Sequence, residues 1–128
     1  MIVGWRRGDG RWLLIRRSRH VAAPLRVCFP GGAVETGEDR DVAAVREVRE
    51  ELGLAVQLID RVWHHQFTDR NLTLWGYLAK PLDRTLRPDP NEVAEVLWLT
   101  GEQASSHPDM MPMTDRFVAA LQRAAGDR

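Results

Sequence analysis

Apolar and polar positions alternate in several stretches of the chain, and each such stretch predicts a β-strand. The first two, residues 1–5 and 11–17, are separated by an Asp-Gly pair that is typical of a tight hairpin turn. Residues 54–67 and 71–80 predict two longer strands joined by a polar turn, and residues 95–100 predict one more strand. The pattern therefore favours a sheet that contains two hairpins.

Two further stretches repeat their apolar residues at helical spacing. Between Asp39 and Gly53 the residues are mostly good helix formers, with no proline. Asp39 suits the N-cap position, and Gly53 suits the left-handed residue that ends a helix. The second helical stretch, near the C-terminus, has its apolar residues at Phe117, Val118, Leu121 and Ala125. We expect the two helices to cover opposite faces of the sheet.

Length and composition indicate one domain that spans residues 1–128. A chain of this length buries roughly two thirds of the surface that it exposes when unfolded. The formal charge is zero, so no overall field favours nucleic-acid polymers or anionic membranes. The single cysteine, Cys28, excludes an intramolecular disulfide and is expected to pack as a small hydrophobe. With no apolar run near the ~20 residues of a membrane span, we expect a cytoplasmic protein.

Acidic residues are concentrated in and around the first predicted helix. Five of the chain's eight glutamates lie in residues 32–54. Glu47, Glu50 and Glu51 fall within about 100° of one another on the helix surface, and like charges at this spacing repel by about 0.2–0.5 kcal/mol per pair. Neighbouring arginines on a solvated surface would relieve this repulsion. A hard divalent cation such as Mg²⁺, which takes oxygen ligands, is the alternative.

The segment before this helix favours the cation. Pro30 restricts the backbone, while the glycines at 31, 32 and 37 permit close approaches that a side chain would block. Such a loop can direct backbone groups at an ion or a phosphate. Glu38 follows at the junction with the helix, where it can reach the guanidinium of Arg46.

Together these residues resemble the Nudix box, G-x5-E-x7-R-E-U-x-E-E-x-G-U, in which U is aliphatic. Every specified position is matched, at Gly32, Glu38, Arg46, Glu47, Val48, Glu50, Glu51, Gly53 and Leu54. The chain is thereby identified as a member of the Nudix hydrolase family. The resemblance implies an α/β (α+β) fold, the Nudix α/β/α sandwich with a central mixed sheet, in which the box helix covers one face and the C-terminal helix the other.

The same resemblance implies a metal site and roles for its residues. Mg²⁺, or Mn²⁺ in its place, would be held by the carbonyl group of Gly31 and by Glu47, Glu50, Glu51 and Glu92. Glu47 or Glu92 would activate water, and Arg46 would orient the carboxylates through charge-assisted hydrogen bonds. Glu95 is the alternative to Glu92. Gly32, Glu38 and Gly53 would have structural roles in the box.

Other segments are similar to the MutT-like subgroup, whose members remove oxidised guanine nucleotides. Arg17 lies twelve residues before Phe29, at the distance of a nucleotide-contacting arginine in that subgroup, and the Asp69-Arg70 turn is also shared. The resemblance implies substrate contacts at Arg17, Phe29, Arg70 and Thr114. MutT has an asparagine at the position of Thr114, and a hydroxyl cannot reproduce the paired donor and acceptor of an amide. Recognition of 8-oxoguanine is therefore left open.

The implied activity is Mg-dependent hydrolysis of a nucleoside diphosphate linked to another moiety. A (d)NTP, including oxidised nucleotides, cleaved to the monophosphate and pyrophosphate is the first expectation. Nucleotide sugars, ADP-ribose and dinucleotide polyphosphates are the alternative substrates. A sensor domain that binds a nucleotide without hydrolysing it is a further alternative, which the intact box acids disfavour. The expected partner is a small-molecule nucleotide, not a nucleic-acid polymer or a membrane, and the protein would be a monomer or a homodimer.

Overall fold

The structure of the protein is a computed structural model that describes residues 1–126. Within this part of the chain the elements follow one another as β1 (Ile2–Gly4), β2 (Trp12–Arg17), β3 (Val27–Cys28), α1 (Arg40–Leu52), β4 (Val56–Phe67), β5 (Leu72–Pro81), β6 (Val93–Leu99), α2 (Gly101–Ser106) and α3 (Thr114–Ala125). None of these helices is long and apolar enough to cross a membrane.

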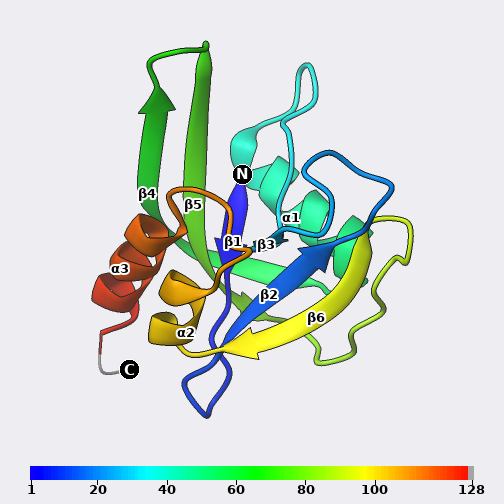
Figure 1. The fold of residues 1–128 in the computed structure, drawn as a ribbon, viewed down its shortest axis with the longest axis vertical. Coiled ribbons are helices and arrows are strands. Elements are labelled where there is room, and N and C mark those ends of the chain that lie inside the picture. Colours follow the sequence, from blue (N-terminus) through cyan, green and yellow to red (C-terminus); the bar gives the residue numbers. More distant parts are fainter. Residues whose placement is uncertain (127–128) are drawn as a thin grey trace.

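The strands form two three-stranded sheets (Figure 1). One has the order β1-β5-β4, with β1 parallel to β5 and β4 antiparallel to it. The other has the order β3-β2-β6 and is antiparallel throughout. The mixed strand directions agree with the predicted fold class, although the strands are divided between two sheets. The predicted hairpin of β4 and β5 is confirmed, and in Figure 1 its turn extends beyond the rest of the molecule.

The predicted hairpin of the first two strands forms only at its turn. The N–H of Arg7 donates to the carbonyl of Arg11 at 2.8 Å, and that of Leu13 donates to the carbonyl of Trp5 at 3.0 Å. Beyond these bonds the strands separate, because β1 pairs with β5 while all six residues of β2 pair with β6. Tertiary pairing partners therefore override the local hairpin signal.

The two predicted helices are confirmed, and they pack on different clusters of the core. α1 ends at Gly53, which has a φ of 64° and whose N–H donates to the carbonyl of Arg49. The buried Val48 and Leu52 of α1 belong to one apolar cluster, whereas Phe117 and Leu121 of α3 belong to the other. The helices thus cover opposite sides of the strands, as predicted.

The short helix α2 was not predicted. Its N-cap, Thr100, and Gln103 form a capping box, in which the Thr100 hydroxyl accepts from the Gln103 N–H at 3.1 Å. The Gln103 side chain in turn accepts from the Thr100 N–H at 2.9 Å. This Thr-x-x-Gln spacing was the signal in the sequence that could have revealed the helix.

Candidate active site

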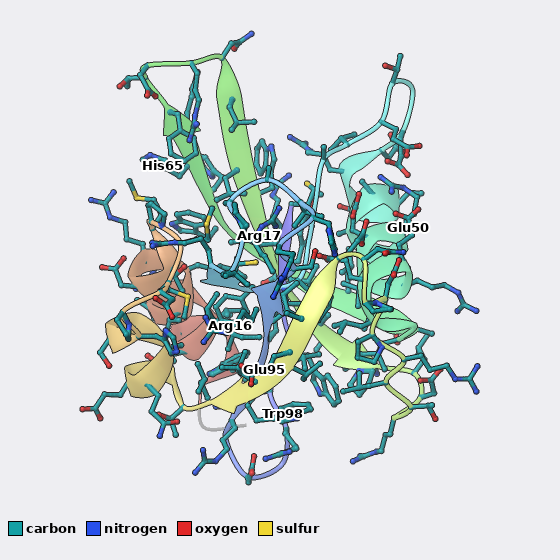
Figure 2. All side chains as sticks on the ribbon, turned by 45° about the vertical axis from the view of Figure 1, so that its right-hand side comes forward. Arg16, Arg17, Glu50, His65, Glu95 and Trp98 are labelled. Carbon is teal, nitrogen blue, oxygen red and sulfur yellow. The ribbon has the colours of Figure 1, made fainter. Side chains whose placement is uncertain are left out.

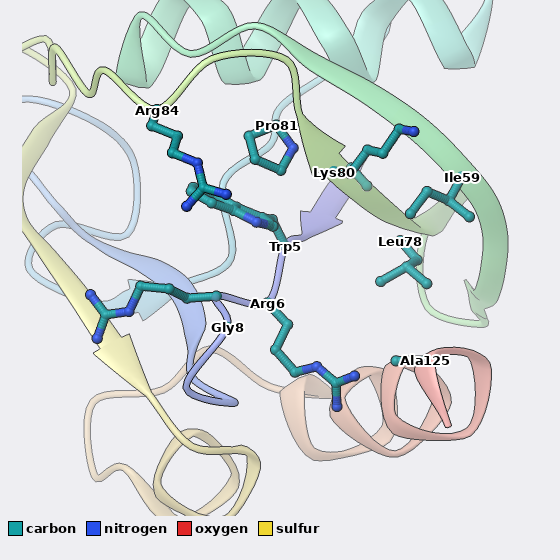
Figure 3. A pocket seen from close by; sticks show the side chains of 11 residues that line it. Trp5, Arg6, Gly8, Ile59, Leu78, Lys80, Pro81, Arg84 and Ala125 are labelled. Atoms are coloured by element: carbon teal, nitrogen blue, oxygen red, sulfur yellow. The ribbon is translucent and has the colours of Figure 1, made fainter. Parts of the chain in front are cut away.

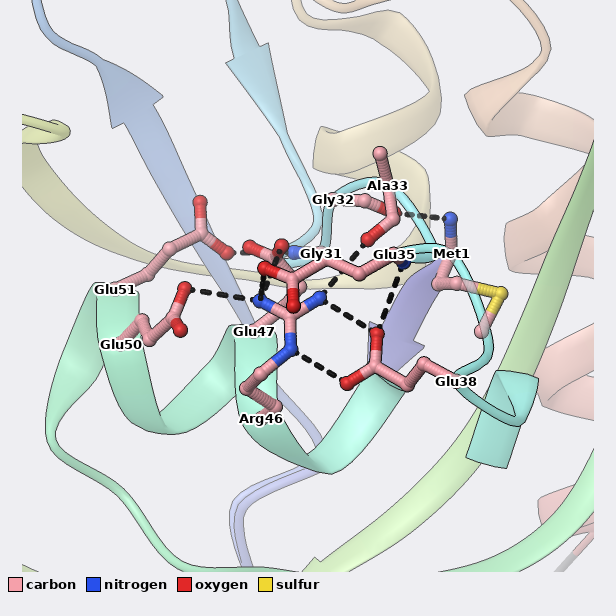
Figure 4. A network of polar contacts seen from close by, with 10 residues as sticks. All are labelled: Met1, Gly31, Gly32, Ala33, Glu35, Glu38, Arg46, Glu47, Glu50 and Glu51. Atoms are coloured by element: carbon pink, nitrogen blue, oxygen red, sulfur yellow. Dashed lines mark hydrogen bonds and ion pairs between the residues drawn. The ribbon is translucent and has the colours of Figure 1, made fainter. Parts of the chain in front are cut away.

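Arg46 lies at the centre of a polar network on α1 (Figure 4). Its Nε and Nη2 donate to the two carboxylate oxygens of Glu38 at 2.7 and 2.9 Å, a bidentate pair that lowers the pKa of Glu38 to about 2. Its Nη1 donates to Glu47 at 3.0 Å and to Glu50 at 3.1 Å. A further bond from Nη2 to the carbonyl of Ala33, at 3.0 Å, ties the helix to the preceding loop. One guanidinium thus neutralises part of the acidic surface.

The glycine turn lies between this acidic surface and the first residues of the chain. Glu51 is only 5 % exposed, and it accepts a hydrogen bond from the N–H of Gly31 at 2.7 Å. A side chain on Gly32 would overlap the carboxyl group of Glu47, and one on Gly31 would overlap the carbonyl of Met1. The absence of side chains at both positions therefore lets α1 and the N-terminal segment approach the same turn. The contact of Met1 with Gly32 could not be predicted from the sequence, because the two residues lie 31 positions apart and leave no local pattern.

Glu92, immediately before β6, adds a third carboxylate beside Glu47 and Glu51. Burial, together with the charges of Glu47 and Glu92, raises the pKa of Glu51 to about 8. Burial also raises the pKa of Glu47, with contributions from Glu50 and Glu92. The Oε2 atom of Glu92 is buried and has no hydrogen-bond partner within residues 1–126. Buried polar atoms without partners are rare and costly, so the negative charge of this group is only partly compensated by Arg46, by Arg17 and by the N-terminal ammonium group of Met1.

The structure separates Glu92 from its alternative, Glu95. The carboxylate of Glu95 accepts a hydrogen bond from the Nε of Arg16 at 3.3 Å, and the Nη1 of Arg16 donates to Asp109 at 3.0 Å. Figure 2 shows Arg16 and Glu95 side by side and apart from Glu50 on α1. Glu92 is therefore the acid that the chain brings to the box carboxylates.

Two of the residues predicted to contact the substrate, Arg17 and Thr114, each donate a hydrogen bond to a backbone carbonyl. Arg17 donates from its Nε to the carbonyl of Ala22 at 2.7 Å, and its charge lowers the pKa of Glu51, so it lies within electrostatic reach of the box. Thr114, the first residue of α3, is buried, and its hydroxyl donates to the carbonyl of Met111 at 2.7 Å.

The other two predicted substrate residues lie elsewhere. Phe29 is 2 % exposed, and its ring packs between those of Trp12 and Phe117, with centroid distances of 6.5 and 4.9 Å. These contacts anchor the segment before the glycine turn to the core, and the substrate contact of Phe29 stays a prediction. Arg70 lies at the exposed turn of the β4–β5 hairpin, where its guanidinium lies 4.3 Å from the ring centroid of Phe67.

Comparison with known proteins identifies the family. A family model described as the NUDIX domain matches residues 1–121. The chain belongs to the Nudix family. This Nudix chain is 32 % identical, over 127 residues, to the 8-oxo-dGTP diphosphatase of Escherichia coli K12, and the match covers 94 % of each protein. It is a MutT-like Nudix hydrolase that acts on phosphoanhydride bonds.

Solved structures confirm the Nudix fold. The crystal structure of the MutT protein from Methanosarcina mazei Go1 superposes with a TM-score of 0.80 at 20 % identity, covering 98 % of this chain and 92 % of that one. The solution structure of the E. coli ORF135 protein superposes with a TM-score of 0.74 at 27 % identity, covering 98 % of this chain and 90 % of that one. The predicted fold class is therefore confirmed.

Nudix hydrolases generally use divalent metal ions. In the described part of this chain, no three or more His, Cys, Asp or Glu side chains are arranged to hold a metal ion. The box carboxylates are instead engaged in hydrogen bonds, since Arg46 bonds to Glu47 and Glu50 while Glu51 bonds to Gly31. The donors nevertheless fit a hard cation in chemical type, since all are oxygen atoms and one of them, on Glu92, has no partner among residues 1–126.

The single cysteine is not a candidate nucleophile. Burial raises the pKa of the Cys28 thiol to about 11, so the thiol stays protonated at neutral pH. This agrees with the expectation that Cys28 packs as a small hydrophobe.

Proposed function

We propose that this Nudix hydrolase is a Mg-dependent nucleotide pyrophosphohydrolase that cleaves a (d)NTP to the monophosphate and pyrophosphate. The observation that carries the proposal is the convergence of Glu47, Glu51 and Glu92 beside the glycine turn, where burial and mutual repulsion raise the pKa of Glu51 to about 8. A divalent cation bound to a nucleotide's phosphates would relieve that repulsion. The similarity to a diphosphatase of 8-oxo-dGTP supports a nucleoside triphosphate as substrate.

The proposed ligands of Mg²⁺, or of Mn²⁺, are the Gly31 carbonyl and the carboxylates of Glu47, Glu50, Glu51 and Glu92. When bound, the ion would offset the negative charge of the phosphate oxygens, which otherwise repels an incoming water or hydroxide. Glu51 would stay ionised in such a site despite its burial, since an adjacent cation favours the charged form.

The remaining roles belong to the chain's own side chains. Glu47 and Glu92 are the two proposed acceptors of the proton from the attacking water, because both carboxylates lie beside Glu51 in the buried group. Arg46 is a positioning residue, since its bonds set the directions of the Glu38, Glu47 and Glu50 carboxylates. The guanidinium of Arg17 would attract the substrate's phosphates toward the same place.

The proposed substrate range is set by Thr114. Its hydroxyl hydrogen is already donated to the carbonyl of Met111, so the side chain can offer a base only an acceptor. We therefore expect at most a preference of about tenfold for 8-oxo-dGTP over dGTP, the value of roughly one hydrogen bond. We further propose that residues 1–128 act as one domain in the cytoplasm, as a monomer or a homodimer.

The test is release of pyrophosphate and phosphate from a nucleotide panel, with MgCl₂ or with EDTA. The panel contains the four dNTPs, 8-oxo-dGTP, a nucleotide sugar, ADP-ribose and a dinucleotide tetraphosphate. We expect pyrophosphate from dNTPs in Mg²⁺ alone. Turnover of another class with dNTPs untouched would replace the proposed substrate, and binding without any turnover would indicate a sensor.

A further inference from the structure

A second concave region lies away from the box carboxylates. It is a pocket of about 300 Å³ between the turn that follows β1, the end of β5 and the segment after it. Its floor is apolar, formed in part by Ile59, Leu78 and Pro81. None of the residues proposed for hydrolysis lines it. The pocket and the box turn lie toward opposite ends of β1, because Met1 bonds to Gly32 while Trp5 lines the pocket.

Trp5 gives the pocket a flat aromatic surface. Its ring meets the ring of Trp98 edge to face, at a centroid distance of 5.2 Å and an interplanar angle of 83°. This contact fixes the orientation of an indole that remains half-buried. In Figure 3 the ring lies between Arg84 and Pro81 on one side and Arg6 on the other. Such a surface suits a planar ring, since aromatic rings stack favourably beyond the effect of the area that they bury.

Two positively charged side chains on the rim of the pocket, Lys80 and Arg84, have no ion-pair partner among the described residues. Both side chains are exposed. Arg7, by contrast, is paired with Asp9 at 2.7 Å. None of the described residues that line the pocket is acidic. In a chain whose formal charge is zero, this local excess of cations attracts an anion.

We propose that this pocket binds a nucleoside monophosphate, with the base on Trp5 and the phosphate between Lys80 and Arg84. A flat apolar surface beside two unpaired cations matches a ligand that joins a planar ring to a phosphate. A volume of about 300 Å³ is at the low end for ligand pockets, and it therefore favours a mononucleotide over a dinucleotide. The site goes beyond the proposed hydrolysis, because it shares no residue with the box.

The test is a titration of the intact protein with AMP in EDTA, followed by the indole N–H signals in NMR spectra. The Trp5 signal is the one missing from the Trp5→Phe variant. We expect this signal to shift and to saturate with a Kd of about 1 mM or below. Adenosine and inorganic phosphate should each bind at least about tenfold more weakly, because each makes only half of the contacts. EDTA prevents metal-dependent turnover, so failure of the proposed hydrolysis would not change this result.

A pair of matched variants separates this site from general charge effects. Lys80→Gln with Arg84→Gln should weaken AMP binding at least about tenfold and leave dNTP hydrolysis unchanged. Arg116→Gln with Arg123→Gln removes the same charge from exposed positions of α3 and should leave the Kd within about twofold. Absence of saturation at the Trp5 signal would overturn the proposal. So would equal affinity of the first double variant and the unaltered protein.

Discussion

Two clusters of this protein contain an arginine that binds two or more carboxylates, and only one of them resembles a site. Around Arg16, the carboxyl groups of Glu95 and Asp109 have side chains that are 55 % and 48 % exposed. Around Arg46, the side chains of Glu38 and Glu47 are only 12 % and 15 % exposed. Water can screen both acids of the first cluster, whereas in the second it can screen only Glu35 and Glu50, which are 69 % and 51 % exposed.

The count of charges separates the clusters further. Arg16 faces two acids, whereas Arg46 is within 4.0 Å of four, at Glu35, Glu38, Glu47 and Glu50. Glu51 and Glu92 then add two acids beyond the guanidinium's reach, near Glu47. An ion-pair network alone therefore does not indicate a functional site. A buried excess of negative charge does indicate one, because such an excess destabilises the fold and is retained nevertheless.

The largest effect is expected from Glu51→Gln, which removes the most buried acid and leaves its shape. Turnover of the best dNTP should fall about 10²–10³-fold, as for the loss of one group that stabilises transition-state charge. Glu95→Gln, in the exposed cluster, is the matched control and should retain near-normal turnover. Steady-state kinetics with circular dichroism checks both. Near-normal Mg²⁺-dependent activity in both Glu51→Gln and Glu50→Gln would refute the assignment of the site.

Arg46→Lys tests whether orientation of the carboxylates matters as well as charge. A lysine keeps the positive charge and cannot make the bidentate bond to Glu38 together with the bonds to Glu47 and Glu50. We expect kcat to fall about 10–100-fold with the melting temperature changed by only a few degrees, the usual cost of losing a residue that orients ligands. Arg16→Lys is the control. An equal loss of kcat in the two variants would show that the clusters are equivalent.

The buried surplus of charge should also make the metal-free protein sensitive to alkali. Burial raises the pKa of Glu51 from 4.5 to about 8 in the folded state, so folding favours its protonated form. That contribution is complete below pH 4.5 and is lost as the pH rises through 8. In EDTA, the free energy of unfolding should fall by about 2 kcal/mol between pH 6 and pH 9. Urea unfolding measures this, and Glu51→Gln should reduce the slope, whereas an identical slope in the variant contradicts the assignment.

The smallest effect belongs to the exposed cluster. Arg16→Gln should cost less than about 1 kcal/mol of stability, because pairs with exposed partners are screened by solvent. In the unaltered protein, 0.5 M NaCl should screen these ion pairs. In the Arg16→Gln variant, the same salt should cause little further loss of stability. Urea unfolding with and without the added salt provides the measurement. A loss of several kcal/mol in the free energy of unfolding would show that the Arg16 cluster is not screened by solvent.

Local patterns predicted those parts of the fold that depend on neighbours in sequence. The box helix, its end at Gly53 and the β4–β5 hairpin all follow from residues a few positions apart. The path of β1 could not be predicted in this way, because its pairing with β5 joins Val3 to Tyr77 across most of the chain. The division into two sheets could not be predicted either, because it depends on the pairing of strands that are far apart in the sequence.

The candidate site also combines residues that local spacing predicts with residues that only long-range contacts place. Glu47, Glu50 and Glu51 come together because one helix carries them, and the spacing of a helix is known from the sequence. Glu92 and Glu95 could not be told apart from the sequence, because they lie three positions apart at the start of one strand, and only the structure shows their different surroundings. The burial of Phe29 could not be predicted either, because a sequence does not show that the residue before a glycine turn packs into the core.

The network around Arg46 has one further consequence for how a metal would enter. The guanidinium of Arg46 already neutralises part of the acidic surface of α1. A divalent ion held by Glu47 and Glu50 would have to compete with Arg46 for these carboxylates. The apparent affinity for the ion would depend on the hydrogen bonds that Arg46 loses to Glu47 and Glu50 as well as on the bonds that the ion forms.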